Sequence, residues 1–449
     1  MLVVLFSRGA TGARAADTNQ VSPEFVRQVL ERLARAEQEI KELRQELSNR
    51  APATPTNAPA TPDARYQQRL EQAESALAGL NSQLAVKDAA EQREKYPSLQ
   101  FHGFGDVDYA ADTRRAPNVP GMASGTPYGV AYYGEKNTFY LGEFDVFLNA
   151  LLSPDASVVS ETVFSADSAN QMGVDIERLY LEYRFNDCFN VDAGRFHTAL
   201  GYYNTTFHHG TFLQTAIGRP TFLQFEDSGG ILPVHMVGLE IHGAVPSGSL
   251  NLAYSAAVGN GLDYSANPNL NSVEQTLSFS DSKAVNLALT AKPDWLPGLQ
   301  FGGNVYFDAI TPDNAGTTNN VPHNNQTILG ASAVYNSAKW EFLNEAYIIA
   351  DKPANGQPHY NTAFYTQLAR KCGVLTPYVR FNYYHISLND TLYTLDWQGG
   401  VNAGIHYGPS LGLRYDFTGY AALKLQYDYL VDYGFNSASR VNVQACFTF

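Results

Sequence analysis

Residues 439–449 read SRVNVQACFTF, and residues 420–430 read YAALKLQYDYL. In both stretches aliphatic or aromatic side chains alternate with polar ones: Lys424, Gln426 and Asp428 alternate with leucine and tyrosine, and Arg440, Asn442 and Gln444 alternate with valine and alanine. Alternation with a period of two is typical of a strand that has one apolar and one polar face. These two segments therefore predict strands that separate an apolar medium from water.

The same alternation recurs in segments of about ten residues from Leu99 to Phe449, with turn-forming residues between them. Sixteen segments are expected, starting near residues 99, 138, 156, 173, 189, 237, 249, 284, 299, 325, 339, 360, 375, 407, 420 and 439. Short links, such as Ser153 to Asp155, alternate with long ones, such as residues 110–137. The pattern predicts an all-β transmembrane barrel of about 16 antiparallel strands over residues 98–449. A soluble β-sandwich is the alternative, but it gives no reason for this alternation of link lengths.

Composition narrows the class of protein further. Charged residues make up 16% of the chain and aromatic residues 12%, and no later apolar run approaches the roughly 18 residues of a spanning helix. The net charge of -14 argues against binding to nucleic acid, whose phosphates require a basic surface. The three cysteines lack the spacing of a disulfide framework or a zinc site.

The first 95 residues have a different character. Residues 1–15 resemble a truncated signal peptide, and residues 51–64 form a linker rich in Pro, Ala and Thr. Residues 22–50 predict a coiled coil, and residues 65–95 predict a second coiled-coil helix. The seam of the first helix follows alternating steps of three and four: Val26, Val29, Leu33, Ala36, Ile40, Leu43 and Leu47. Such short helices need partners, which implies an oligomer unless they fold back on their own chain.

The barrel resembles a Gram-negative trimeric porin, closest in plan to the phosphate-selective porin O/P family and its coiled-coil-bearing relatives. The resemblance rests on the strand count, on the last strand Val441–Phe449 ending in Phe, and on the segment GRFHTALG at 194–201. It implies an outer-membrane location with the α-helical stalk in the periplasm, surrounding lipid, a homotrimer, and recognition of the Phe449 strand by the barrel-assembly machinery. The lysine cluster of the phosphate-selective members is not visible here, so phosphate selectivity is not carried over.

Charged residues on the expected inward face divide into two walls. The basic wall consists of Arg380, Arg414, Lys424 and Arg440, and the acidic wall of Asp106, Asp108, Glu143, Asp145, Asp308, Glu341 and Glu345. Facing walls of opposite charge would create a transverse field that orients solutes. The alternative is that these residues solvate a water-filled lumen or pair with one another.

The longest connection, from His197 to Met236, is the expected constriction loop. Its aromatic residues would pack against the barrel wall, and its charged residues would set the field at the narrowest point. The candidate residues are Tyr202, Tyr203, Arg219, Glu226 and Asp227. The segment also holds four histidines, among them His208 and His209, but adjacent histidines diverge on an extended chain and no carboxylate completes a ligand set, so no metal is expected.

The predicted function is a porin for passive diffusion of small hydrophilic solutes or ions. We expect no cofactor and no enzymatic activity, because no nucleophile, base and orienting group fall together in the sequence. The alternative function is a structural one, in which the barrel anchors a coiled coil that tethers or spaces the cell envelope through contact with the cell wall.

Overall fold

The computed structural model describes residues 31, 34–35, 38–45, 96–112, 138–166, 172–207, 209–225, 230–262, 281–311, 323–394, 403–433 and 437–449. The chain divides into two compact units, Met1–Tyr96 and Pro97–Phe449. No helix among the described residues is both long and apolar enough to cross a membrane.

In the first unit, the described residues between 31 and 45 are helical. Ile40 and Leu43, two positions of the predicted seam, are 7% and 3% exposed within the single chain. The predicted signal peptide, linker and second helix lie outside the described residues.

The described residues of the second unit form sixteen strands. Their bounds are β1 (Ser98–Asp112), β2 (Thr138–Leu151), β3 (Ala156–Ala166), β4 (Met172–Asn186), β5 (Phe189–His197), β6 (His235–Val245), β7 (Leu252–Gly259), β8 (Ala284–Ala291), β9 (Leu299–Ile310), β10 (Asn324–Asn336), β11 (Trp340–Pro353), β12 (His359–Arg370), β13 (Leu375–Ile386), β14 (Gly404–Asp416), β15 (Ala421–Asp432) and β16 (Ala438–Thr448). The short helices are α3 (Tyr202–Thr206), η2 (Thr221–Leu223), η4 (Gly248–Leu250) and α4 (Thr391–Thr394).

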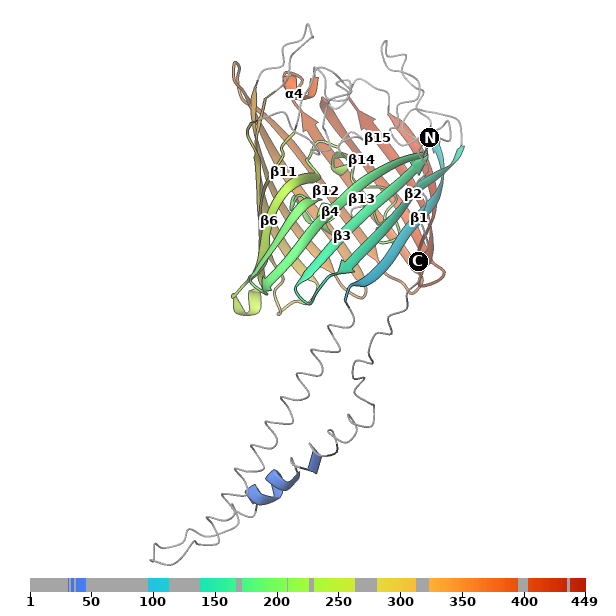
Figure 1. Ribbon diagram of the computed structural model, residues 1–449. Coiled ribbons are helices and arrows are strands. Elements are labelled where there is room, and N and C mark those ends of the chain that lie inside the picture. The colour runs from blue at the N-terminus through green and yellow to red at the C-terminus, as the bar shows by residue number, and fades with distance from the viewer. Residues whose placement is uncertain are drawn as a thin grey trace, which may run out of the picture. The chain divides into compact units, whose positions relative to one another are not determined.

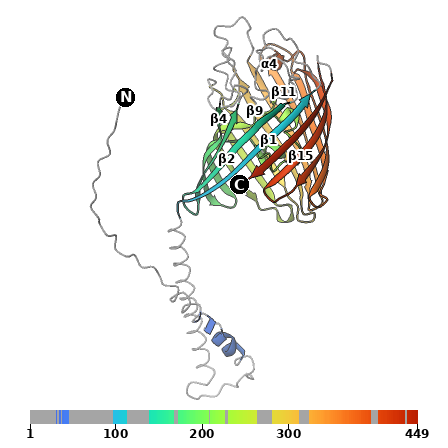
Figure 2. The same ribbon diagram turned by 90° about the vertical axis from the view of Figure 1, so that its right-hand side faces the viewer.

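The strands form a closed antiparallel barrel in sequence order, with β1 beside β16 (Figures 1 and 2). At the seam, the backbone N–H of Phe449 donates to Gly103 O at 3.1 Å, and Gly103 N–H donates to Phe449 O at 3.0 Å. Phe449 lies at the end of the barrel that carries the short turns. The predicted barrel of 16 antiparallel strands is confirmed, and each of these described strands has a neighbour on both sides.

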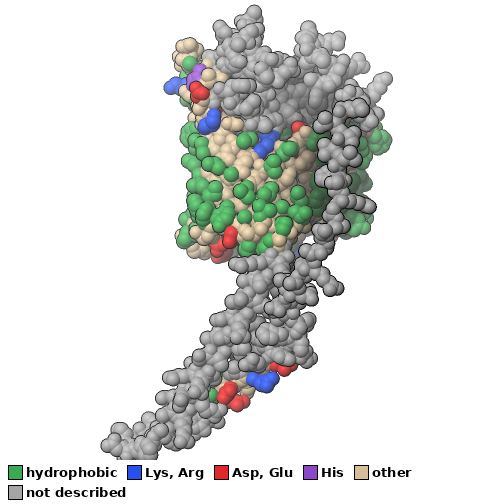
Figure 3. Space-filling view, viewed as in Figure 1, with side chains coloured by type: hydrophobic (Ala, Val, Ile, Leu, Met, Phe, Trp, Pro, Cys, Tyr) green, Lys and Arg blue, Asp and Glu red, His purple; other side chains and the backbone are tan. Residues whose placement is uncertain are grey.

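The two faces of the barrel differ as the alternation predicts. Along β15, Leu423, Leu425 and Tyr427 are exposed on the outside, whereas Lys424 and Gln426 are buried inside. Figure 3 shows hydrophobic side chains across the middle of the visible barrel face. Such an apolar exterior suits lipid, because each strand makes its backbone hydrogen bonds to the two neighbouring strands of the closed sheet.

Part of the interior is filled by apolar side chains, which the predicted polar inner face did not include. Inward side chains of β9 to β13, including Tyr306, Ile328 and Ile349, are fully buried in one apolar cluster. The same cluster includes Leu200 and Phe222 from the connection between β5 and β6. This connection therefore packs inside the barrel, against the wall formed by β9 to β13.

A row of glycines crosses the three strands next to that connection. Gly194, Gly238 and Gly259 lie directly opposite one another on β5, β6 and β7. A Cβ atom at Gly238 would lie 2.1 Å from Val258 O and 2.5 Å from the Cα of Gly259. Because both obstacles are backbone atoms of a paired strand, only glycine allows this close approach.

We expect Gly238→Ala to destabilise the barrel. Overpacking against an immobile backbone costs about 1–3 kcal/mol, so the temperature at which the folded band disappears on an SDS gel should fall by several degrees. Gly303→Ala on β9 is the matched control, because a Cβ there meets nothing within 4 Å. Equal melting of the two variants would contradict this account of the glycine row.

Candidate functional site

Residues 198–234 leave β5, cross the interior of the barrel and return to β6; we call this segment the inward loop. It carries the short helices α3 and η2, and Figure 1 shows its trace inside the ring of strands. Of its predicted residues, Tyr202, Tyr203 and Arg219 are described, whereas Glu226 and Asp227, together with His208, lie outside the described residues.

Aromatic side chains fasten the inward loop to β11 and β12. Tyr203 makes an edge contact with Tyr365 at a ring-centroid distance of 5.8 Å, and Phe222 meets Tyr347 at the same distance. Arg219 lies over the ring of Tyr203, 5.5 Å from its centroid, and donates to Asn204 Oδ1 at 3.2 Å. The Arg219 side chain is thus held within the loop itself.

Glu345 of β11 accepts four hydrogen bonds. The backbone N–H groups of Tyr202 and Tyr203 donate to it at 2.9 and 2.8 Å, and the hydroxyls of Tyr347 and Tyr365 donate at 2.7 Å each. Glu345 is 2% exposed. A buried carboxylate is stable only when its oxygens are paired in this way, so Glu345 ties the start of α3 to the wall.

Gly201 makes that contact possible. Its φ of +85° lies in the left-handed region, and a Cβ there would lie 1.9 Å from both Glu345 Oε2 and Tyr347 Oη. Any other residue would be strained and would displace the carboxylate from the two N–H groups.

Two further acidic residues bind hydroxyls of the inward loop. The Thr215 hydroxyl donates to Glu341 Oε2 at 2.9 Å, and the Thr211 hydroxyl donates to Asp106 Oδ1 at 3.0 Å. Glu143 on β2 lies 2.8 Å from Nδ1 of His209. The acidic residues on the two sides of the barrel therefore hold different parts of the same loop.

The basic residues bind carbonyl oxygens of the loop. Arg380 donates to Gly218 O at 2.8 Å and Ile217 O at 3.2 Å. Arg414 donates to Phe212 O and Gln214 O at 2.6 and 2.8 Å. Lys424 donates to Thr211 O at 2.6 Å and is 0% exposed. These three cations point inward; the loop covers Arg380 and Lys424, whereas the side chain of Arg414 is 12% exposed.

The other predicted wall residues also face inward and are buried. Asp308 accepts from the backbone N–H of Leu262 at 2.7 Å and from the Tyr306 hydroxyl at 3.2 Å. Arg440 lies on β16 directly opposite Asp428. Asp108 on β1 and Asp145 on β2 are 4% and 1% exposed.

A histidine and glutamate cluster adds contacts that the sequence analysis missed. His209 Nε2 and His235 Nε2 both approach the carboxylate of Glu177 on β4, at 3.1 and 2.8 Å, and the ring of His209 stacks on Phe225 at 4.0 Å. Burial alone would lower the pKa of His209, but Glu143 and Glu177 outweigh it and raise that pKa well above the ordinary value. The histidine is therefore expected to be charged at neutral pH.

No metal centre emerges from the described part of the chain, where no three His, Cys, Asp or Glu side chains are arranged to hold an ion. The histidines instead bind carboxylates of the wall. The sequence analysis missed this pairing because alternation does not identify which residues meet across the lumen.

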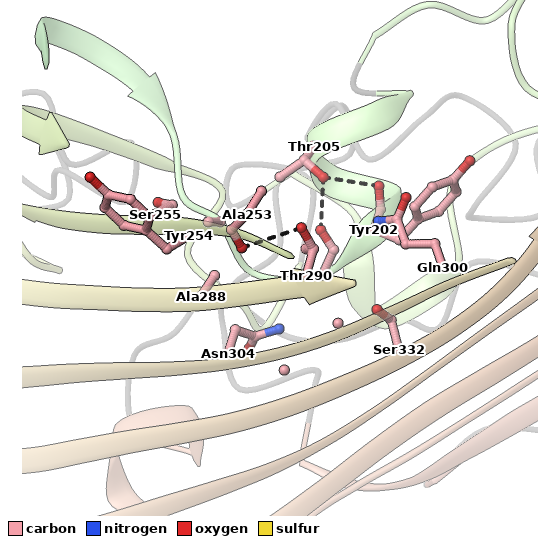
Figure 4. A pocket seen from close by; sticks show the side chains of 14 residues that line it. Tyr202, Thr205, Ala253, Tyr254, Ser255, Ala288, Thr290, Gln300, Asn304 and Ser332 are labelled. Atoms are coloured by element: carbon pink, nitrogen blue, oxygen red, sulfur yellow. Dashed lines mark hydrogen bonds between the residues drawn. The ribbon is translucent and has the colours of Figure 1, made fainter. Parts of the chain in front are cut away.

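A cavity of about 110 Å³ lies between α3 and the inward faces of β7 to β10 (Figure 4). It is in the half of the barrel nearer the short turns. Tyr202 and Thr205 contribute from the loop, and Gln300, Asn304 and Ser332 contribute from the strands. All of its lining side chains are uncharged.

Comparison with known proteins identifies the architecture. The sequence matches no protein-family profile and no curated protein. An anion-selective porin from Comamonas acidovorans superposes with a TM-score of 0.52 at 13% identity, covering 78% of this chain and 99% of that one. The outer-membrane channel DcaP of Acinetobacter baumannii superposes with a TM-score of 0.50 at 10% identity, covering 78% and 97%. The chain has the fold of an outer-membrane porin barrel. At these identities the likeness extends to the fold alone.

We expect Glu345→Gln to loosen the inward loop. A glutamine presents an N–H₂ group to donors that need an acceptor, and leaving such groups unpaired costs about 1–3 kcal/mol. Single-channel conductance in planar bilayers should therefore become larger or fluctuate more. Glu182→Gln changes an inward glutamate of β4 that has no described bond to the loop, and it should behave like the unmodified protein. If the current through Glu345→Gln fluctuates no more than that through this control, the role of Glu345 is contradicted.

The contacts of His209 predict that the inward loop becomes less firmly held at alkaline pH. Because the pKa of His209 is raised in the folded protein, its ion pairs stabilise the loop fully below the ordinary histidine pKa of about 6.5. They are lost as the pH rises through the higher folded value. Channel fluctuations should increase across that alkaline range, and His209→Gln should lack the transition. A transition that persists unchanged in His209→Gln would show that another group causes it.

Proposed function

We propose that this protein is an outer-membrane porin through which small hydrophilic solutes or ions diffuse passively. The observation that carries the proposal is a closed barrel with an apolar exterior, whose interior holds a wall-anchored loop beside a small cavity. A loop folded into a barrel narrows the passage and determines what can pass. The porin fold of the two solved structures above supports the same function.

The charged walls have two roles in this proposal. Their first role is to anchor the loop, as the contacts of Glu345, Arg380 and Lys424 indicate. Their second is to set the field in the remaining passage, where the half-buried Glu143 is 33% exposed and Arg414 is 12% exposed. We propose that these two residues, on opposite sides of the loop, contribute most to ion preference.

The assembly that we propose follows the sequence analysis. In this proposal the barrel lies in the outer membrane, and the barrel-assembly machinery recognises the Phe449 strand. The helices predicted before residue 96 lie in the periplasm. We propose a homotrimer, as the resemblance to trimeric porins implies; membership of the phosphate-selective O/P family stays a prediction. The structural alternative, an anchor whose coiled coil contacts the cell wall, requires no passage through the barrel.

Planar-bilayer recordings of the purified protein separate these two functions. The porin proposal predicts stable, ohmic single-channel steps, and a salt gradient gives the ion preference from the reversal potential. Replacing Arg414 by Gln removes a partly exposed cation and should shift that potential toward cations. A protein that inserts into the bilayer but never conducts would refute the porin proposal and favour the anchor.

A further inference from the structure

The outer surface of the barrel carries a cation close to the short turns. Arg370 is the last residue of β12, and it shares the outward face of that strand with Leu368, whereas Ala369 is buried on the inward face. Glu341 of β11 lies directly opposite Ala369, so it faces inward too, where it accepts from Gln367 Nε2 at 2.7 Å. The positive charge of Arg370 and this negative charge are therefore on different sides of the wall.

An aromatic ring holds the Arg370 side chain in place. Arg370 lies directly opposite Trp340, the first residue of β11, and its guanidinium carbon is 5.1 Å from the centroid of the Trp340 ring. The ring electrons attract the guanidinium and fix its orientation on the outer surface. No carboxylate among the described residues forms an ion pair with Arg370, so its N–H groups are available to an anion from outside the chain.

Two lysines lie next to this pair in the adjoining short turns. The Lys371 ammonium donates to Asn336 Oδ1 at 2.8 Å and to Ser337 O at 3.1 Å, and the backbone N–H of Lys371 donates to Lys339 O at 2.8 Å. These bonds join the turn between β10 and β11 to the turn between β12 and β13. All of the acceptors are neutral, so three positive charges gather here with no ion-pair partner in the described part of the chain.

Apolar side chains continue the outer surface away from the turns. Phe342 and Leu368 lie opposite each other, two residues along their strands from Trp340 and Arg370. Val379 of β13 lies beside Leu368, and all three apolar side chains are 41% exposed. Tryptophan is typical of the membrane–water boundary, where the headgroup of a phospholipid meets its acyl chains. The surface thus has a cationic part at that boundary and an apolar part on the membrane side.

We propose that an anionic phospholipid binds at this surface, which consists of Lys339, Trp340, Arg370 and Lys371 at the boundary and of Phe342, Leu368 and Val379 beside it. The guanidinium fork binds the headgroup phosphate, the lysines attract its negative charge, and the acyl chains lie on the apolar side chains. A free phosphate ion would gain nothing from the apolar part. The proposal rests on the membrane location proposed above, but it does not require the barrel to conduct.

Quenching of Trp340 fluorescence by brominated lipids tests the proposal. The chain has two other tryptophans, Trp295 and Trp397, and replacing both by Phe leaves Trp340 as the single reporter. The full chain is placed in phosphatidylcholine vesicles that contain a small fraction of brominated phosphatidylglycerol, or the same fraction of brominated phosphatidylcholine. Because each basic residue at a membrane surface strengthens the binding of an anionic lipid about fivefold, phosphatidylglycerol should be enriched at Trp340 at least about fivefold over its bulk fraction.

Variants assign the enrichment to the basic residues. The double variant Arg370→Gln/Lys339→Gln removes two charges and keeps the bonds of Lys371, so the enrichment should fall close to the bulk fraction. Lys352→Gln is the matched control, because it removes an exposed, outward lysine at the opposite end of β11, and it should keep the enrichment. The quenching of each variant is referred to its own fluorescence without brominated lipid, since Arg370 touches the reporter ring.

Several results would overturn the phospholipid site. Equal quenching by the two brominated lipids would show no preference, and no quenching by either would show that another copy or segment covers this surface. An enrichment that survives the double variant, or that Lys352→Gln removes equally, would show that these cations do not cause it. Loss of the enrichment when inorganic phosphate replaces chloride at constant ionic strength would assign the cations to free phosphate. A protein that enriches the lipid but never conducts would refute only the porin function.

Discussion

A segment that folds into the inside of a barrel must find partners for its backbone N–H and C=O groups, because water does not reach all of them. In this protein the wall supplies those partners. Glu345 accepts hydrogen bonds from two N–H groups at the start of α3. Further along the loop, Arg380, Arg414 and Lys424 donate to carbonyl oxygens. The anionic residue of the wall binds N–H donors of the loop, and the cationic residues bind its carbonyl acceptors.

This requirement explains how the interior is divided. Next to β9 to β13 the loop buries aromatic and aliphatic side chains in a dry cluster, which contributes the hydrophobic part of the anchorage. Next to β7 to β10, where Gly302 and Ser332 leave room, the cavity remains. On the side of β2 and β4, His209 joins the loop to Glu143 and Glu177. A single loop therefore separates an apolar cluster, a cavity with uncharged lining and a charged region within one bore.

Most of the barrel could be predicted from the sequence. Alternation with a period of two located the strands to within a few residues, as β16 illustrates: it was expected to start near 439 and starts at Ala438. The same alternation assigned the inward side of Lys424 and Glu345 correctly, because the face of a strand is a local property.

What the sequence did not reveal are contacts across the lumen. Period-two alternation states that Arg380 points inward, but not that a carbonyl of a loop 162 residues away in sequence will cover it. The inward Tyr306 and Ile328 break the polar pattern of the lumen, and only the position of the loop explains them. The glycine row at Gly238 likewise depends on how closely three strands approach one another, which composition does not encode.

The central claim is that the wall holds the inward loop in place, and hydrogen–deuterium exchange of the protein in a lipid bilayer tests it most directly. The account predicts that the amides of Tyr202, Tyr203 and Ile217, which donate to Glu345 and Gln426, exchange as slowly as those of β11 and β13. Exchange of these amides as fast as that of the exposed turn at Ser153 to Asp155 would contradict it.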